Sequence, residues 1–443
     1  MLLLRYIRHA VALNVAALIF CAVNLHAAWN LTFPFYHEDQ PPAPPANAAP
    51  APKDQAPVAM PVTVPEVPKE AVTEVPSLPP PVVVPADIAP QPASPVPSAQ
   101  PPARDDTRQS GNLAVFDDAR HIPTTTYTED TLWQGKLRLD GWITIASQAT
   151  LTIAPGTIIR VGAGSGINVL GRIVVKGTAD EPVTVASLNS EPVPGQWRGI
   201  ILTGSEKKNI LENLRIEGAE TGLLARYSSF VSRGITISRS VTGLHLQECV
   251  AGMTDSRING SATGIVTENS ELTLDKALIE SNVTGIILKS SALFAIDATL
   301  VGNRSIGLSA DDSRLKLDRF LVKGSETGAR FSRSEGSISD SSFSDNIEAG
   351  AVLSGSRLKV YGTLFSGNRI GLQVDDDLPV LWNNALFSNK SYNLLYMGEK
   401  TYFAGGNWFG SSERTTVERT LFSKRTGALQ ADPYLAKSPV DKD

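Results

Sequence analysis

A short phrase that returns every 21 or 22 residues between Thr221 and Gly371 is the feature that most constrains the fold of this chain. Each copy is built around one glycine, and the steps between successive glycines are 21, 21, 21, 22, 21, 22 and 21 residues. A repeat of this length is typical of a solenoid, in which each unit buries its apolar side only by stacking on its neighbours. The repeating glycines are Gly222, Gly243, Gly264, Gly285, Gly307, Gly328, Gly350 and Gly371.

Apolar residues follow each glycine with a period of two, as Ile286 and Leu288 follow Gly285. A second apolar pair comes later in many units, for example Leu272 and Leu274. A period of two indicates short strands with one face turned inward, so the pattern predicts three strands and three turns in each coil. We expect a third inward position at Leu278, Leu300, Phe343 and Phe365.

Asparagine stands shortly before the repeating glycine in several units. Asparagine tolerates the backbone angles of tight turns, and its amide can hydrogen-bond to the asparagine of the next coil. We therefore expect a ladder of stacked side chains formed by Asn259, Asn282, Asn303, Asn346 and Asn368.

Two further segments support one particular solenoid. The run from Gly141 to Ile201 contains "ATLTIAPGTIIRVGAGSGINVLGRIVVKGTADEPVTVAS" followed by "WRGI", and "GNWFG" at 406–410 is followed by "GALQADPYL". From roughly residue 108 to 436 the chain resembles bacterial right-handed parallel β-helix proteins with pectate-lyase-like repeats. The resemblance implies an all-β solenoid. It leaves the function open, because this architecture serves lyases, hydrolases, epimerases, adhesins and spacers.

The first residues predict a membrane segment. Residues 1–9 carry Arg5, Arg8 and His9, and residues 10–29 are mostly apolar. Basic residues before about 20 apolar ones favour an uncleaved anchor whose basic end stays in the cytoplasm. A cleaved signal peptide is the alternative.

A proline-rich stretch follows. Residues 40–102 hold 21 of the 30 prolines of the chain and no glycine. Proline fixes φ and removes backbone donors, so we expect residues 30–103 to form a disordered, semi-rigid spacer rather than a core. At about 3.1 Å per residue, such a spacer could reach roughly 200 Å.

Glycine marks the start of the folded part, since all 35 glycines lie at or after Gly111. We expect an irregular N-terminal cap at 104–140, the β-helix at 141–402, a C-terminal cap at 403–436 and a tail at 437–443. Caps are needed because an open end would expose strand edges and apolar core.

The net charge limits which partners the chain can bind, and the cysteine content limits which disulfides it can form. A net charge of −5 over 443 residues argues against nucleic acid, which needs a basic surface. Of the two cysteines, Cys21 lies in the apolar segment, so Cys249 has no partner in the folded part and is expected to be a small buried residue. Nothing in the sequence calls for a cofactor.

Catalytic residues are not evident. The outward positions two and five residues after each glycine never place two carboxylates on adjacent coils, so no acid/base pair is visible. The Asn-Thr-Asp, Gly-His-Gly, Arg-Ile-Lys, Arg-x-x-Pro-x-x-Arg and Asp-Pro-His-Asp motifs of β-helix enzymes are absent. His245 is the only histidine of the repeats and is expected at the surface. An enzyme remains the alternative if the fold gathers Asp, Glu, Arg or Lys from three neighbouring coils in one groove.

Acidic turns are weak candidates for Ca²⁺, which takes six to eight oxygens. Consecutive carboxylates point in different directions, so we expect solvated turns and no metal. The candidates are Asp311, Asp312, Asp375, Asp376 and Asp377.

Tryptophans gather toward the two ends of the repeats. Trp133, Trp142 and Trp197 lie near the first coils and are candidates for stacking on a sugar ring or a protein partner. Trp382 and Trp408 lie near the last coils. The favoured interpretation is that these side chains close the ends of the core.

These observations predict a bacterial envelope protein, single-pass in the inner membrane through residues 10–29, with a periplasmic β-helix. If the N-terminal segment is cleaved, the domain would be secreted or surface-exposed. We expect a non-catalytic scaffold that binds an envelope polysaccharide or an envelope protein. The alternatives are a polysaccharide lyase, hydrolase or epimerase with an unfamiliar site, and a mechanical spacer or structural component of an envelope complex.

Overall fold

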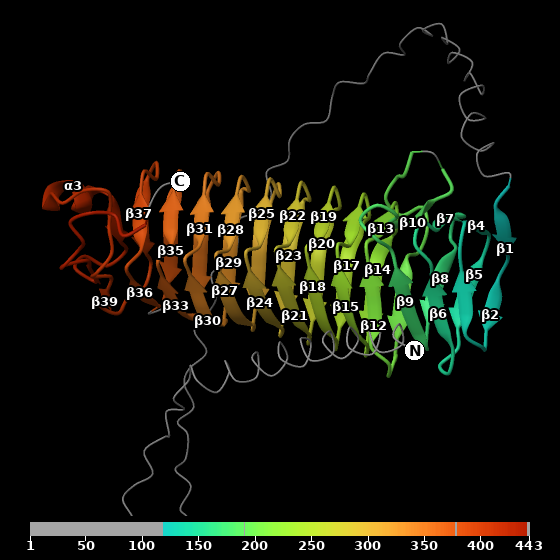
Figure 1. Cartoon of the computed structure of the whole chain (residues 1–443). Coiled ribbons are helices and arrows are strands. Elements are labelled where there is room, and N and C mark those ends of the chain that lie inside the picture. The colour runs from blue at the N-terminus through green and yellow to red at the C-terminus, as the bar shows by residue number, and fades with distance from the viewer. Residues whose placement is uncertain (1–117, 190, 377–378, 441–443) are drawn as a thin grey trace, which may run out of the picture. The chain divides into compact units, whose positions relative to one another are not determined.

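The computed structural model describes residues 118–189, 191–376 and 379–440, which form a parallel β-helix of the right-handed type (Figure 1). The predicted membrane segment at 10–29 and the spacer at 30–103 lie outside the described residues. No helix within the described ranges is long and apolar enough to cross a membrane. The predicted all-β solenoid is confirmed.

Each coil adds one strand to each of three parallel sheets, named A, B and C in chain order, so strands three apart in sequence are neighbours. Sheet A consists of β1 (Arg120–Ile122), β4 (Lys136–Leu139), β7 (Ile158–Val161), β10 (Val183–Ser187), β13 (Leu214–Glu217), β16 (Thr236–Ser238), β19 (Arg257–Asn259), β22 (Leu278–Glu280), β25 (Thr299–Val301), β28 (Leu321–Lys323), β31 (Ser342–Ser344), β34 (Leu364–Ser366) and β37 (Ala385–Phe387). Sheet B consists of β2 (Thr125–Tyr127), β5 (Trp142–Ile145), β8 (Gly166–Val169), β11 (Ile200–Thr203), β14 (Thr221–Arg226), β17 (Thr242–Gln247), β20 (Thr263–Glu268), β23 (Thr284–Lys289), β26 (Ile306–Asp311), β29 (Thr327–Ser332), β32 (Ala349–Ser354), β35 (Ile370–Asp375), β38 (Tyr392–Tyr396) and β40 (Leu421–Ser423). Sheet C consists of β3 (Thr131–Trp133), β6 (Thr150–Ile153), β9 (Arg172–Lys176), β12 (Asn209–Glu212), β15 (Ser229–Arg233), β18 (Val250–Thr254), β21 (Glu271–Asp275), β24 (Ala292–Ile296), β27 (Arg314–Asp318), β30 (Glu335–Ser339), β33 (Arg357–Tyr361) and β36 (Val380–Trp382).

The repeating glycines lie at the start of the sheet B strands, where consecutive backbones come very close. A Cβ added at Gly285 would lie 2.3 Å from the carbonyl oxygen of Gly307, and one at Gly222 would lie 2.7 Å from that of Gly243. The other glycines of the series from Gly243 to Gly350 meet the next glycine at distances between these two. Glycine recurs here because no side chain fits between the coils.

The turn from sheet B to sheet C uses two residues. The first has a left-handed backbone, as at Asn269 with φ 49° and Ser290 with φ 47°. Most L-residues resist this conformation, but here each backbone N–H also bonds the next coil, for example Asn269 N to Lys289 O at 3.1 Å. The hydrogen-bonded stack therefore holds even unsuited residues such as Tyr227 in the left-handed region.

The second residue of this turn forms a serine ladder that the sequence interpretation missed. The Ser270 N–H donates to Ser291 Oγ at 3.1 Å, and Ser291 Oγ donates to Lys289 O at 2.8 Å. Cys249 occupies one step, where its N–H donates to Ser270 Oγ at 3.0 Å. Its side chain is 4% exposed, which confirms the prediction of a small buried residue. The remaining ladder positions are Ser228, Ser313, Ser334 and Ser356.

The asparagine ladder forms at the turn from sheet A to sheet B. Asn282 Nδ2 donates to Asn303 Oδ1 at 3.1 Å, and Asn346 Nδ2 donates to Asn368 Oδ1 at 3.0 Å. The prediction is confirmed for these four residues. It is wrong for Asn259, because this residue ends β19 on the outer side of the turn and its Oδ1 has no hydrogen-bond partner.

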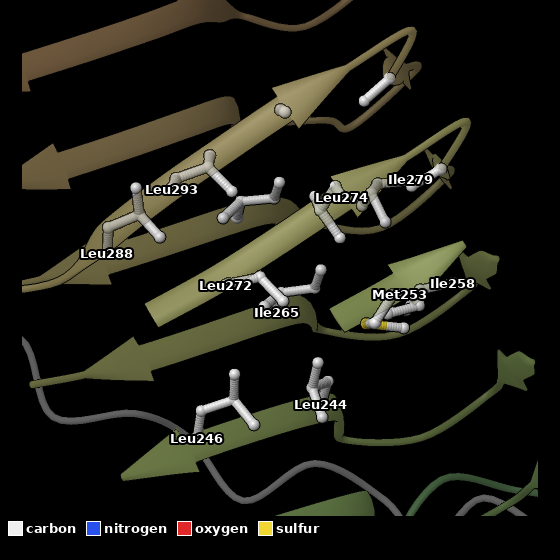
Figure 2. Packing of buried hydrophobic residues seen from close by; sticks show 14 of the residues in the cluster. Leu244, Leu246, Met253, Ile258, Ile265, Leu272, Leu274, Ile279, Leu288 and Leu293 are labelled. Atoms are coloured by element: carbon white, nitrogen blue, oxygen red, sulfur yellow. The ribbon is translucent and has the colours of Figure 1, made fainter. Parts of the chain in front are cut away.

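The core is one continuous column of apolar side chains inside the coils (Figure 2). Leu272 and Leu274 are fully buried, as their period of two predicted. Leu300, Phe343 and Phe365 are buried as well, but the prediction for Leu278 is wrong by one residue. Ile279 points inward there, because Leu278 is the first residue of β22 and the strand alternates from it.

The first coil begins earlier than predicted. The strands β1 to β4 lie within 120–139, so the described part of the predicted 104–140 cap already belongs to the β-helix. The sequence of this segment lacks the repeating glycine with its apolar pair, so it did not predict strands.

At the other end, β40 extends sheet B, and β39 (Tyr402–Phe403) pairs with β41 (Leu429–Gln430). The short helix α3 (Arg414–Arg419) buries Val417 against the core.

The glycine contact predicts a sharp contrast between two substitutions. Gly285→Ala should lower the stability by about 1–3 kcal/mol, because its methyl group would overlap the Gly307 carbonyl. Gly252→Ala is the matched control, since a Cβ there would lie 3.7 Å from Val231 Cγ1, an ordinary contact. Urea unfolding followed by circular dichroism measures both, and equal midpoints for the two variants would contradict the crowding argument.

Candidate functional site

A groove runs along the two-residue turns that join sheets B and C. Its floor is the serine ladder, and its volume is about 910 Å³. We call it the BC groove, and it is lined by Glu248, Cys249, Val250, Asn269, Ser270, Glu271, Ser290, Ser291, Ala292, Asp312, Ser313, Arg314, Arg333, Ser334, Glu335, Gly355 and Arg357.

Charged side chains from neighbouring coils meet in this groove as ion pairs. Arg333 Nε lies 2.9 Å from Asp312 Oδ1, and Arg333 also contacts Asp311. Glu335 lies between two arginines, with its carboxylate 3.6 Å from Arg314 and 3.7 Å from Arg357. All these side chains are largely solvent-exposed, so the pairs fix side-chain positions and add little stability.

The groove was missed because the prediction compared one outward strand position and one turn position. The ion pairs of Glu335 involve the position seven after the repeating glycine, where Arg314, Glu335 and Arg357 occupy three successive coils. The pair of Asp312 with Arg333 lies at the compared turn position, where only pairs of carboxylates were sought. Alternating charge at one height of a repeat is the signal that could have found them.

Charged neighbours in the BC groove favour the ionised forms of Asp312 and Arg333. The hydrogen bond from Arg333 lowers the pKa of Asp312, and the Asp312 and Asp311 carboxylates raise the pKa of Arg333. A general acid or base works best with a pKa near the operating pH, and Asp312 is shifted away from it.

The outer face of sheet C lies beside the BC groove and continues past it to the last strand of the sheet, β36. Lys316, Ser337 and Lys359 lie side by side on β27, β30 and β33. Both lysines are exposed, and within the described residues neither forms an ion pair. They leave two uncompensated positive charges beside the groove.

Exposed aromatic side chains lie next to these lysines. Tyr361 on β33 and Trp382 on β36 occupy paired positions and are 41% and 63% exposed. Val380 pairs with Lys359 and is also exposed. Phe403, on the closing strand β39, is exposed as well. Gly406 lies against the indole of Trp382, since a Cβ at this position would be 3.2 Å from Trp382 Cδ1. Because glycine has no side chain, one edge of the indole stays uncovered. We call Lys316, Ser337, Lys359, Tyr361, Val380 and Trp382 the sheet C face.

The tryptophans predicted near the first coils have different positions. Trp133 and Trp197 are fully buried, so a surface role for these two is wrong. Trp197 Nε1 donates to Glu217 O at 2.8 Å, which explains why an indole fits in the coil interior. Trp142 is 39% exposed and lies over Gly166 on sheet B, so it keeps an accessible surface.

The acidic turns are hydrogen-bonded to side chains of the protein itself. Asp311 and Asp312 contact Arg333, while Asp375 accepts hydrogen bonds from Ser354 Oγ at 3.0 Å and Gln373 Nε2 at 2.9 Å. Asp376 is the left-handed turn residue at φ 52°, and Asp377 lies outside the described residues. Within the described ranges no three His, Cys, Asp or Glu side chains gather as a metal site.

His245 lies on the outer face of sheet B between Leu224 and Val266 on the adjacent coils. Its side chain is 24% exposed, its Nε2 has no hydrogen-bond partner and Glu268 Oε2 is 3.7 Å away. Burial lowers the pKa of His245, although Glu268 acts in the opposite direction. The predicted surface histidine is thus half-buried in an apolar column.

Two family models match the chain. One, described as pectate-lyase like beta helix domain, matches residues 125–224. The other, described as periplasmic copper-binding protein (NosD), matches residues 228–413. No curated protein gives a significant match to the sequence.

Several solved structures match the chain at low sequence identity and with TM-scores below 0.5. The periplasmic alginate epimerase AlgG is 14% identical over 69% of this chain and 76% of its own, with a TM-score of 0.34. The A-module of the mannuronan C-5 epimerase AlgE6 from Azotobacter vinelandii is 12% identical over 74% and 94%, with a TM-score of 0.26. An alginate lyase from Paenibacillus sp. is 13% identical over 63% and 93%, with a TM-score of 0.27. These likenesses concern the fold alone.

The half-buried His245 predicts a pH-dependent stability. The unfolded chain binds a proton at this side chain near the ordinary pKa of 6.5, whereas the folded chain binds it only at lower pH. Between the two pKa values the unfolded state holds more protons, so the free energy of unfolding falls as the pH drops below about 6.5. Urea titrations between pH 5 and 8 measure this slope.

The variant His245→Val supplies the comparison, because valine already occupies the equivalent position at Val266. It should lose the part of the slope that His245 contributes and be more stable than the natural chain at pH 5. An unchanged difference between the two proteins across the pH range would contradict the assignment.

Proposed function

The chain belongs to the right-handed parallel β-helix proteins with pectate-lyase-like repeats, and on that premise we propose that it is a non-catalytic scaffold of the bacterial envelope that binds an acidic polysaccharide. The single observation that carries the proposal is the sheet C face, where Tyr361 and Trp382 lie exposed beside Lys316 and Lys359. Aromatic rings offer flat apolar surfaces for sugar rings, and ammonium groups attract the carboxylates of an acidic glycan.

The geometry of the face suits a polymer better than a small molecule. Lys316 and Lys359 are two strands apart, which corresponds to roughly 9.5 Å at the usual spacing of parallel strands. Trp382 lies one strand further along the same direction. A chain laid across the strands would therefore meet two cations and then an aromatic platform in sequence, with Ser337 available as a hydrogen-bond donor between the lysines.

The BC groove beside this face gives the enzyme alternative its specific support. Acidic and basic side chains from neighbouring coils line this one groove, namely Asp312, Arg314, Arg333, Glu335 and Arg357. A lyase, hydrolase or epimerase on this repeat was expected to require such a gathering. The pairing of these charges with one another favours binding over catalysis, because a base held in an ion pair is a weak proton acceptor.

A periplasmic location fits the description of the second family model. The copper named in that description does not fit the described residues. Copper favours imidazole and sulfur ligands, but His245 faces Glu268 on sheet B while Cys249 is held in the serine ladder. No metal step enters the proposal. Attachment to the inner membrane through residues 10–29 and the reach of the 30–103 spacer belong to the same proposal.

The alternative of a mechanical spacer would be favoured by evenly polar faces without a groove. The BC groove and the exposed Trp382 count against it. An envelope protein as partner stays open as an outcome of the experiment.

Binding to acidic glycans should depend on the sheet C face. We expect the full-length chain in detergent to co-sediment with polyuronates and to release them as salt is raised, because screening weakens the lysine contacts. The pair Lys316→Gln and Lys359→Gln, and the pair Tyr361→Ala and Trp382→Ala, should each weaken binding roughly thirtyfold, in line with about 1 kcal/mol for each of the two lost contacts.

The matched controls are Trp142→Ala, an exposed indole at the other end of the helix, and Lys323→Gln, a lysine paired with Asp345. Both should bind as the natural chain does. Equal binding of neutral and acidic glycans, or loss of binding in Trp142→Ala alone, would contradict the proposal. Shortened polymers, unsaturated ends or altered uronate stereochemistry would establish the enzyme alternative, and absence of any glycan effect would favour a protein partner.

A further inference from the structure

A second, smaller pocket lies on the outer face of sheet A, over three successive coils. Its volume is about 560 Å³. It is lined by Arg215, Glu217, Thr236, Ser238, Arg239, Arg257 and Asn259. Neither the family descriptions nor the proposed glycan face involves these residues, so the pocket stands independently of the function proposed above.

Strand register places two arginines on either side of one hydroxyl group. Arg215 on β13 pairs with Thr236 on β16, which pairs with Arg257 on β19. The backbones of the two arginines are therefore about two strand spacings apart, roughly 9.5 Å, with Thr236 between them. The Arg257 guanidinium contacts Glu280 on β22, the strand on its other side. This arrangement is built by the repeat itself, because every coil presents the same position at the same height.

The charges of the pocket do not cancel. Arg239 Nε donates to Glu217 Oε1 at 2.9 Å, and Arg257 is paired with Glu280. Within the described residues Arg215 forms no ion pair. Three guanidinium groups thus face two carboxylates, which leaves one positive charge in a chain whose net charge is −5.

A polar atom in the pocket also lacks a partner. Asn259 Oδ1 is buried and accepts no hydrogen bond. A buried acceptor without a donor is unfavourable by about 1–3 kcal/mol, so a turn of the Asn259 amide toward a hydroxyl group of a ligand in the pocket would be favourable.

From these observations we propose that the pocket binds a phosphate ester carried by a hydroxyl-bearing group such as a polyol. Arg215 is free to bind an anion, and Arg257 would join it from the opposite side by turning from Glu280 toward Thr236. An anion held in this way needs oxygens that point in several directions. A tetrahedral phosphate supplies three such oxygens, whereas a carboxylate offers two in one plane. The hydroxyl group of Thr236 donates to the phosphate between the two forks, and Asn259 accepts from the carrier.

In the envelope this chemistry is shared by phospholipid head groups and by phosphorylated glycans, and two probes separate them. Short-chain phosphatidic acid below its micelle concentration represents the lipid, and glucose 1-phosphate represents the glycan. The full-length chain in detergent is titrated with each by calorimetry, with glycerol 3-phosphate as the common reference. Tighter binding of either probe than of the reference assigns the source and supports the pocket.

Two variants locate the binding. Arg215→Gln should weaken glycerol 3-phosphate roughly tenfold or more, because it removes the uncompensated charge. Thr236→Val should weaken it a few-fold. The control is Arg226→Gln, which makes the same change of charge on sheet B, where Arg226 Nε contacts Gln247 at 2.6 Å, and it should bind like the natural chain.

Three results would overturn the proposal. One is no binding of glycerol 3-phosphate by the natural chain, and another is equal affinity in Arg215→Gln with an unchanged circular dichroism spectrum. The third is equally tight binding of glycerate, which carries a carboxylate in place of the phosphate, because the pocket would then not select a tetrahedral anion.

Discussion

The stacking of each coil on the next through parallel backbone hydrogen bonds is the constraint on which the rest of this molecule depends. It sets one spacing along the whole axis, and every other feature adapts to that spacing. The glycine series is needed because the backbone of the next coil leaves no room for a Cβ, as at Gly285 beside Gly307. Left-handed residues such as Tyr227 are held in place because the same stack bonds their N–H groups. The serine and asparagine ladders repeat the backbone pattern in side chains.

The same spacing converts sequence positions into columns on the surface. A residue on the outer face of one coil meets the residue 21 or 22 places later, so a functional surface arises when a few coils share a chemical type at one position. On sheet C the column through Lys316 and Lys359 keeps its charge free, whereas the column through Glu335 neutralises itself in ion pairs. Ligands are attracted to the first kind of column, because the second has already satisfied its charges.

The fold was predictable because its signal is repeated many times, while the sites depend on single residues. Period-two pairs such as Ile286 and Leu288 could be placed inward because the same pattern recurs after each of the eight glycines. Leu278 was placed wrongly because two adjacent apolar residues give no alternation, and only the strand register selects Ile279. For Trp133 and Trp197 the sequence favoured a role in closing the core and left stacking on a ligand as a candidate, since their burial depends on which face of an irregular early coil they occupy. The BC groove could not be seen until turn and strand positions were placed at one height.

The shortness of the turns keeps the faces of the repeats open. Sheet B passes to sheet C through two residues, as at Asn269 and Ser270, so these turns rise little above the sheet faces of the repeats. The longer connection between β10 and β11 lies beside Gly218 and Ala219, on the first coils and away from Trp382. An open face of this kind suits the proposed binding of a polymer, which many weak contacts along neighbouring coils would hold.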